Sequence, residues 1–100
     1  MRHRPLHRVT AFSIVGPYEL DVSFDDGVTQ RINFARVLEG RLYGPLKDLN
    51  VFNAVRITDD GVTLEWPNGA DFDPSELHDW PAVEAKWIAA AQEWGEADKK

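Results

Sequence analysis

The chain has 100 residues, a hydrophobic content of 43% and a formal net charge of −6, which suits one domain with a single core. It contains no cysteine, so disulfides, thiolate metal sites and a cysteine nucleophile are excluded. No apolar run approaches the roughly 18 residues of a membrane span, and the amino terminus lacks the apolar segment of a signal peptide. We therefore expect a soluble, cytoplasmic protein.

Charge is distributed unevenly along the chain. Residues 1–58 hold eight basic and six acidic side chains, whereas residues 59–98 hold eleven acidic side chains and one basic residue, Lys86. Broad nucleic-acid binding needs a basic face, and only residues 1–8 begin one. We expect no direct nucleic-acid binding, and we interpret residues 1–7 as a flexible basic arm ahead of a domain over residues 8–79.

The first predicted hairpins follow an alternating pattern of apolar residues. Residues 8–15 form a strand with Phe12 and Ile14 on one face and Val9, Ala11 and Val15 on the other. The runs 18–24 and 28–34 form the next two strands. A three-residue loop with a left-handed Gly27 sets Phe24 opposite Val28 and Leu20 opposite Ile32, which aligns their apolar faces.

A second hairpin is predicted over residues 55–58 and 62–66. A two-residue Asp60-Gly61 turn places Ile57 opposite Leu64 and Arg56 opposite Glu65. The sequence Asp-Asp-Gly-Val-Thr thus occurs twice, at 25–29 and 59–63. A duplicated half is one explanation, but two independent hairpins with good turn residues are favoured, because Asp-Gly is a common turn signal.

Between the hairpins, residues 35–54 predict only short helical turns, near 36–39 and 45–49, with Pro45 at a first helical position. The apolar residues of this segment are predicted to fill the core: Leu38, Leu42, Leu46, Leu49 and Phe52. Together these elements predict an α+β fold with about five antiparallel strands, short helical turns in the middle and a C-terminal helix.

The stretch 66–74 predicts a corner. Pro67 ends the strand and Asn68-Gly69 turns the chain. Asp73 is then an N-cap, Pro74 a first-turn proline and Glu76 a capping-box residue for a short helix that ends near residue 79.

Residues 80–100 are interpreted as an amphipathic C-terminal helix and tail, the helix running from Pro81 to about residue 96. Trp80, Trp87 and Trp94 are spaced by seven and share one face with Val83. This stripe either covers the sheet or docks on a partner or on a second copy as a homodimer, since tryptophan is enriched in interface cores.

Five titratable residues lie within residues 71–79, namely Asp71, Asp73, Glu76, His78 and Asp79. They suggest a divalent cation or an acid–base pair, but capping explains two of them and the spacing of a calcium loop is missing. His3 and His7 are four apart beside Pro5, which disfavours a helical ligand pair. We expect no metal, no cofactor and no catalytic residue, because no nucleophile–base motif is present.

Several of these residues together resemble a bacterial domain-of-unknown-function family, number 2442. The resemblance covers roughly residues 8–78 and is carried by Phe24-Asp25-Asp26-Gly27, Gly44-Pro45-Leu46-Lys47-Asp48, Phe52 with Val55, and Trp66-Pro67-Asn68-Gly69-Ala70-Asp71 with Pro74 and Leu77. It implies a small α+β domain without known enzymatic activity, sometimes followed by a helix-turn-helix module or encoded beside a small protein, as in toxin–antitoxin pairs. Asn33, where the family pattern usually has aspartate, and the single helix after residue 80 depart from the pattern.

Two functions follow as hypotheses. The first is a non-catalytic interaction or regulatory domain, antitoxin-like, whose acidic half and tryptophan stripe bind a protein partner, preferably a basic one. The second is a ligand-sensing module of a transcriptional regulator, with a small pocket lined by Trp66, Asn68, Asp71 and His78. A hydrolase is the third and weakest alternative.

Overall fold

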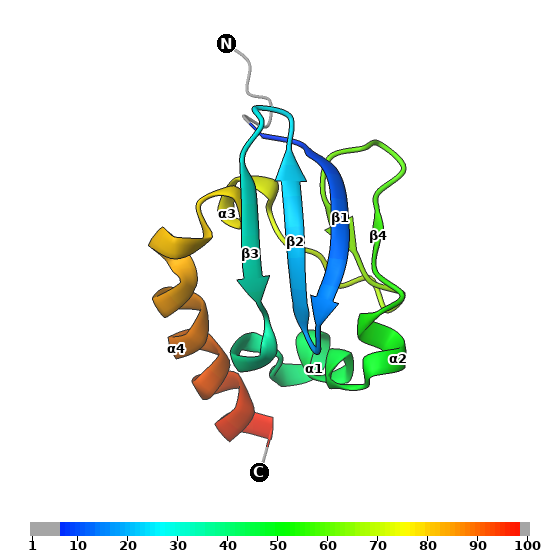
Figure 1. The fold of residues 1–100 in the computed structure, drawn as a ribbon. Coiled ribbons are helices and arrows are strands. Elements are labelled where there is room, and N and C mark those ends of the chain that lie inside the picture. The colour runs from blue at the N-terminus through cyan, green and yellow to red at the C-terminus, as the bar shows by residue number, and fades with distance from the viewer. Residues whose placement is uncertain (1–6, 99–100) are drawn as a thin grey trace.

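The computed structural model describes residues 7–98, which form an α+β fold (Figure 1). A three-stranded antiparallel sheet in the order β1-β2-β3 and a two-stranded sheet, β4-β5, confirm the predicted fold class. The elements in chain order are β1 (Val9–Gly16), β2 (Glu19–Phe24), β3 (Thr29–Asn33), η1 (Ala35–Val37), α1 (Gly40–Tyr43), η2 (Gly44–Lys47), α2 (Leu49–Phe52), β4 (Arg56–Ile57), β5 (Leu64–Glu65), α3 (Pro74–His78) and α4 (Trp80–Asp98).

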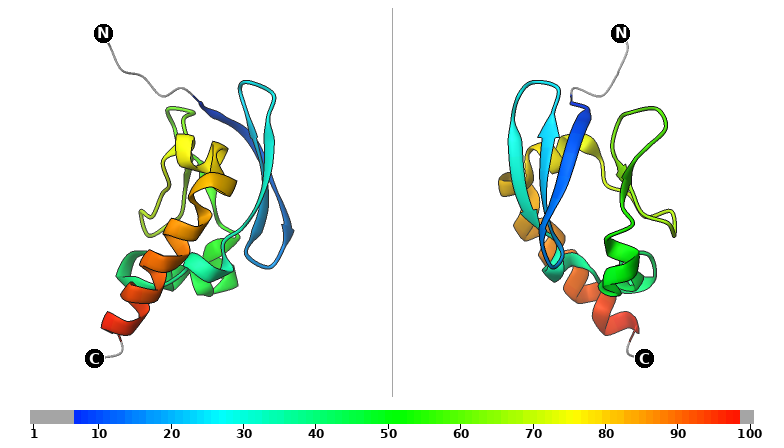
Figure 2. Two further views of the ribbon diagram at one scale, coloured as in Figure 1. Left: turned by 90° about the vertical axis from the view of Figure 1, so that its left-hand side faces the viewer. Right: turned by 45° about the vertical axis from the view of Figure 1, so that its right-hand side comes forward.

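The larger sheet forms one layer, and the helices together with the β4-β5 hairpin lie against one of its faces (Figure 2). Apolar side chains of both layers meet in a single core, which is formed by Val9, Leu20, Val22, Phe24, Ile32, Phe34, Val37, Leu38, Leu46, Phe52, Val55, Leu64, Trp66, Ala70, Phe72, Leu77, Trp80 and Ala91. The outer face of the sheet is left to solvent, as is common for antiparallel sheets.

The β2-β3 hairpin has the predicted register. Leu20 lies opposite Ile32, the Phe24 N–H donates to the Val28 carbonyl at 2.9 Å, and Gly27 has a φ of +89°. Every apolar residue on the inner face of β2 is thereby buried. The alternation of apolar and polar residues was sufficient to predict this loop. The apolar residues of both strands must face the core, and only one register allows this.

The first strand differs from its prediction. The β1-β2 pairing shifts register at Thr10 and again at residue 15, so that both Val9 and Phe12 lie opposite core residues of β2. Val9 was predicted on the opposite face to Phe12; this was wrong because a bulge inserts one extra residue and changes the alternation. Ile14 on this edge strand also remains 44% exposed, although it lies opposite the buried Leu20.

The smaller hairpin has the predicted pairs, Arg56 with Glu65 and Ile57 with Leu64. Its turn is wider than predicted, however. The Thr58 N–H donates to the Thr63 carbonyl at 2.9 Å and the Gly61 N–H donates to the Thr58 carbonyl at 2.8 Å, so four residues, not two, form the loop. Side-chain bonds of Thr58 to the loop N–H groups favour this wider turn.

The middle segment forms η1 and η2 close to the two predicted helical turns, with Pro45 in the first turn of η2. It also forms α1, which was not predicted, and α2, which lies mostly beyond the second predicted turn. Leu38, Leu46 and Phe52 are fully buried as predicted. The prediction was wrong for Leu42 and Leu49, which are 44% and 40% exposed. Helices of four residues present only one turn to the core, so only part of their apolar content can be buried.

The corner after β5 agrees closely with its prediction. The Asp73 side chain accepts a hydrogen bond from Ser75 N, Pro74 occupies the first turn, and α3 ends at His78. Glu76 was predicted to close a capping box, but its carboxylate is directed to α4, where it accepts from Trp87 Nε1 at 2.7 Å. The partly buried indole N–H of Trp87 thereby gains an acceptor, and this bond holds the Glu76 carboxylate away from its own helix N-terminus.

The long helix α4 runs beside η1 and α1 (Figures 1 and 2). Its tryptophan stripe packs inward, but mainly against the helical turns and Phe72, not the sheet that one prediction placed beneath it. Among the described residues, no helix is both long and apolar enough to cross a bilayer.

Most of the predicted arm, residues 1–6, lies outside the described residues, as does the end of the predicted tail, residues 99–100. His7 is the one residue of that arm within them. It is partly buried, with its side chain 20% exposed. The division into a domain over 8–79 and a separate helix over 80–100 remains a prediction, although Trp80 and Ala91 of the helix belong to the common core.

Candidate functional site

Three tryptophans of α4 form a ladder along one side of the molecule. The ring centroids of Trp80 and Trp87 lie 6.4 Å apart, and those of Trp87 and Trp94 lie 5.9 Å apart. Trp80 is buried among Phe34 and Phe72. The seven-residue spacing therefore places all three rings on one helix face, as the sequence indicated.

The second and third tryptophans of the ladder are only partly buried. Tyr43 of α1 packs against both rings, with centroids 5.7 Å from Trp87 and 5.8 Å from Trp94. Gly40 lies close enough to the base of Trp94 that an added Cβ would be 3.0 Å from the Trp94 Cβ. Helix α4 thus packs closely against α1 on its inner face, while the rings of Trp87 and Trp94 are partly exposed at the surface.

A shallow apolar recess lies at this edge, with a volume of about 250 Å³, lined by Glu76, Lys86, Trp87, Ala90 and Trp94. We call it the tryptophan recess. Its floor is aromatic and aliphatic, and its rim carries one acidic and one basic group, whose Lys86 Nζ and Glu76 Oε2 lie 3.7 Å apart. An apolar side chain with a charged neighbour could be accommodated here.

Val83, the fourth residue of the predicted interaction stripe, is partly buried and packs against the core. The stripe therefore divides into two parts. Trp80 and Val83 near the start of α4 contact the core, whereas Trp87 and Trp94 both contact the core and line the recess. Sequence spacing could not separate these two parts, because all four residues share one helix face.

The four residues of the predicted pocket have structural partners in different places. Trp66 is 2% exposed, and its Nε1 donates to the Phe52 carbonyl at 2.9 Å. Asn68 Nδ2 donates to the Leu42 carbonyl at 2.8 Å. Both side chains therefore tie the corner to the middle segment.

Of the other two predicted pocket residues, Asp71 also contacts α1, whereas His78 faces a different part of the molecule. Asp71 is exposed, and its backbone carbonyl accepts a hydrogen bond from the Tyr43 hydroxyl at 2.7 Å. His78 faces the β2-β3 turn, where it binds Asp26. The ligand pocket stays a prediction for which these contacts offer no support.

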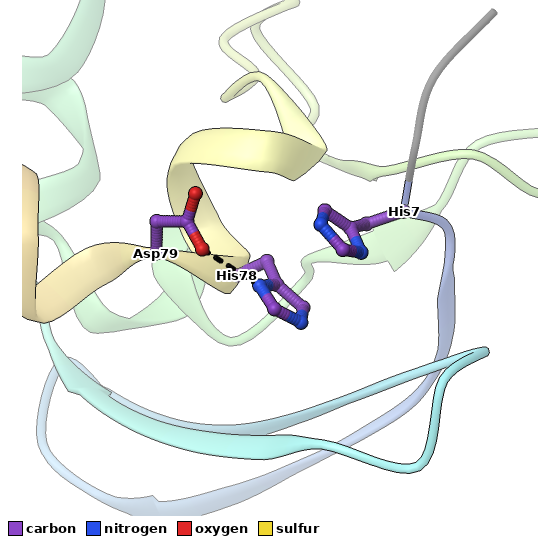
Figure 3. Close-up of side chains that lie close together, drawn as sticks. All are labelled: His7, His78 and Asp79. Atoms are coloured by element: carbon purple, nitrogen blue, oxygen red, sulfur yellow. Dashed lines mark hydrogen bonds and ion pairs between the residues drawn. The ribbon is translucent and has the colours of Figure 1, made fainter.

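A second feature gathers around His78 at the end of α3 (Figure 3). His7 stacks on His78 with ring centroids 3.5 Å apart and an interplanar angle of 6°. His78 Nε2 lies 2.7 Å from Asp26 Oδ2, and His78 Nδ1 lies 2.8 Å from Asp79 Oδ1. We call these four residues the histidine cluster.

Both nitrogens of His78 face carboxylate oxygens, which can only accept hydrogen bonds. Its pKa is raised, first by the bond to Asp79 and then by Asp26, although partial desolvation opposes this. The pKa of Asp26 is lowered, mainly by the bond from the Val28 N–H and further by His78. A doubly protonated His78 satisfies both carboxylates.

Sequence reasoning did not find His7 and Asp26 as members of this cluster. His7 was interpreted as part of a flexible arm and Asp26 as a turn residue. No pairing was predicted for the first two strands; an antiparallel pairing of residues 8–15 with residues 18–24 would have placed His7 near the turn at residues 25–27. The approach of His78 from α3, 52 residues beyond Asp26, carries no local sequence signal.

The geometry described so far defines the class: a small α+β domain in which a three-stranded sheet is covered on one face by short helical turns, a second hairpin and a C-terminal helix. The chain matches the family model described as "Protein of unknown function (DUF2442)" over residues 9–81, and it therefore belongs to that family. This confirms the family resemblance. The match ends at Pro81, so the tryptophan recess is formed largely by residues beyond it. No curated protein and no solved structure matches the chain.

Proposed function

We propose that this chain is a non-catalytic protein-binding domain that uses the tryptophan recess of α4 to hold an apolar side chain from a basic segment of another protein. The observation that carries the proposal is the position of Trp87 and Trp94. Both rings are anchored on Tyr43 from the inside and line an apolar recess on the outside. Rigid aromatic side chains beside a recess are typical anchors of protein interfaces.

The acidic charge around the tryptophan recess favours a basic partner. Residues 59–98 carry eleven acidic side chains and only Lys86 as a basic one. On α4 itself, the acidic residues Glu84, Glu93 and Glu96 accompany that single lysine. A basic segment would be attracted to this surface and oriented on it, whereas a second copy of the same acidic helix would be repelled.

Neutralisation of a basic toxin would be one form of this function. The family resemblance implies gene arrangements of the toxin–antitoxin type, and an acidic binding domain complements a basic target. This form rests on analogy with the family, whereas the general proposal of a basic protein partner rests on the recess and its charge.

The proposal can be tested by isolating the partner and measuring its binding. The tagged chain is used to purify stoichiometric partners from its host, and each identified partner is then titrated with the purified chain by calorimetry. We expect Ala90→Lys to weaken binding at least tenfold, because it fills the recess and adds a repelling charge. Trp94→Ala should weaken binding through loss of the anchor, and added salt should weaken the wild-type interaction.

Ile14→Ala is the matched control, since Ile14 is an exposed apolar residue of β1 on a different element. Circular dichroism and thermal melting establish that each variant is folded. A partner that binds Ala90→Lys and wild type equally would contradict the proposal. A wild-type homodimer in sedimentation that dissociates on the Ala90→Lys change would also overturn it, because the recess would then hold a second copy.

A further inference from the structure

We infer that His7, Asp25 and Asp26 form a binding site for one Zn²⁺-class transition-metal ion at the β2-β3 turn. One ligand atom from each of these residues can be chosen so that all lie within 4.8 Å of one another. Imidazole nitrogen and carboxylate oxygen are ligands that zinc accepts, commonly in a tetrahedral arrangement with water in an open position.

One nitrogen of the His7 ring, Nδ1, is buried and is available to bind an ion. His7 Nδ1 has almost no contact with solvent and no hydrogen-bond partner among residues 7–98, which is uncommon for a buried polar atom. It lies 3.7 Å from Asp26 Oδ2, too far for a hydrogen bond. Two ligands of one tetrahedral zinc ion are separated by about 3.3 Å, given bonds of about 2.0–2.1 Å. The spacing therefore suits a shared ion better than a direct bond.

The two carboxylates are fixed by backbone hydrogen bonds. Asp25 Oδ1 accepts from Arg8 N at 3.2 Å, and Asp26 Oδ1 accepts from Val28 N at 3.0 Å. Each bond engages one oxygen and orients the other. The turn thus supplies two carboxylates that are already positioned, which lowers the entropic cost of binding an ion.

His78 is assigned a positioning role in this site, not the role of a ligand. Its two ring nitrogens are already engaged by Asp26 and Asp79 at 2.7 and 2.8 Å, and its ring is parallel to that of His7. Lone pairs of stacked rings lie in parallel planes and do not converge on one ion. A hydrogen bond from His78 to Asp26 instead orients the carboxylate, as outer partners of metal ligands commonly do.

The ligand set also selects the kind of ion. An imidazole nitrogen favours zinc and similar transition metals, whereas magnesium and calcium prefer oxygen ligands alone. The test is calorimetric titration of Zn²⁺ into the chelator-stripped full chain without an affinity tag, together with thermal melting. We expect one Zn²⁺ per chain and a raised melting temperature, with no comparable effect of Mg²⁺ or Ca²⁺.

Variants assign the ligands. His7→Gln and Asp26→Asn should each weaken Zn²⁺ binding by more than tenfold, and Asp25→Asn should weaken it as well. His78→Gln should weaken it by about 10- to 100-fold, as expected for an outer partner, while NMR still shows the His7 ring resonances shifting on Zn²⁺ addition. Asp59→Asn is the control, because that carboxylate is 97% exposed and lies in the other hairpin.

Each alternative has its own signature. His3→Ala, at a position outside the described residues, should leave binding unchanged; loss of binding in this variant would overturn the assignment in favour of a histidine pair near the amino terminus. Loss on Asp79→Asn without loss on Asp25→Asn would also overturn it. Absence of any heat or melting shift with Zn²⁺, in a wild-type chain shown to be folded by circular dichroism, would remove the site altogether.

Discussion

The two hairpins that share the sequence Asp-Asp-Gly-Val-Thr fold differently. In the first, Asp25–Gly27 form a tight loop between two full strands, closed by Phe24 and Val28. In the second, four residues form the loop and each strand is only two residues long. The glycine has a positive φ in both, +89° at Gly27 and +72° at Gly61. One pentapeptide is therefore compatible with two turns.

The residue before each repeat accounts for much of the difference. Thr58 precedes the second repeat, and its hydroxyl donates to Asp60 Oδ1 and accepts from the N–H groups of Val62 and Thr63. Phe24 precedes the first repeat and is buried in the core. The second aspartate of each repeat accepts from the N–H two residues later, but the outer oxygen of Asp26 is left to meet His78. The bond from the second aspartate to the N–H two residues later therefore stabilises only the loop in the second hairpin. In the first hairpin the same aspartate also joins the side-chain cluster around His78.

The largest effect is expected at Trp66, which follows the second hairpin. With only two residue pairs in its ladder, this hairpin depends on burial of Trp66 and on the bond from its Nε1 to Phe52. Trp66→Ala should lower the free energy of unfolding by about 3–5 kcal/mol, and Trp66→Phe by less. Urea denaturation measures both, with Val15→Ala at the exposed edge of β1 as the control. A loss below about 1 kcal/mol would show that the ladder, not the core, holds the hairpin.

The turns themselves should be equally sensitive to loss of glycine. Gly27→Ala and Gly61→Ala should each cost about 1–2 kcal/mol, because an L-residue is strained at positive φ. Within the described part of the chain, no atom lies within 4 Å of an added Cβ at either position, so packing contributes little. Gly→Asn at the same positions should cost less, since asparagine tolerates this conformation. Costs that differ clearly between the two turns in urea denaturation would show that the positive φ is not the main cause of the loss.

The second hairpin is also fixed from outside by Tyr43, whose hydroxyl donates to the carbonyl of Asp71 beside β5. Desolvation, with the nearby charges of Asp71 and Glu76, raises the pKa of Tyr43. The folded state therefore keeps this phenol protonated where the unfolded state ionises, so stability should fall as the pH rises above about 10.

Tyr43→Phe should remove this part of the pH dependence and should cost about 0.5–1.5 kcal/mol at neutral pH for the lost hydrogen bond. Denaturation series between neutral and alkaline pH compare the two proteins. An unchanged alkaline slope in Tyr43→Phe would show that another group causes the loss of stability.

The smallest effect is expected from the cross-strand ion pairs, one in each hairpin. Arg31 makes two bonds to Asp21, at 2.7 and 2.9 Å, and Arg56 bonds Glu65 at 2.9 Å. All are near the surface, where solvent and salt screen them. Arg31→Gln and Arg56→Gln should shift the urea midpoint slightly at low salt and not at all near 1 M salt, where the Debye length is about 3 Å. A shift that persists at high salt would indicate packing by the arginine stems instead.

The strength of sequence prediction differed among these elements for identifiable reasons. Registers of both hairpins were predicted because Leu20, Ile32, Ile57 and Leu64 must face the core, and a one-residue slip would expose them. The cap at Asp73 and the first-turn Pro74 were predicted because they act within one helical turn. Such local rules need no knowledge of the rest of the chain.

Errors arose where a distant contact decided the outcome. The bulge at Thr10 places Val9 in the core, and no sequence pattern announced it. Glu76 turns to the Trp87 indole instead of its own helix N-terminus. At the candidate sites, spacing predicted that the tryptophans of α4 share a face, but it did not predict which of them would reach the surface.

The sequence by itself determined the α+β class, the hairpin registers, the corner at residues 66–74 and the acidic second half, because hydrophobic alternation, turn residues and charge are local properties of the chain. The tertiary structure alone decided which side chains meet. It set His7 and Asp26 beside His78, and it left Trp87 and Trp94 at the edge of the core. These contacts join segments that are up to 71 residues apart, from His7 to His78, and they depend on how the two layers pack, which no local pattern encodes.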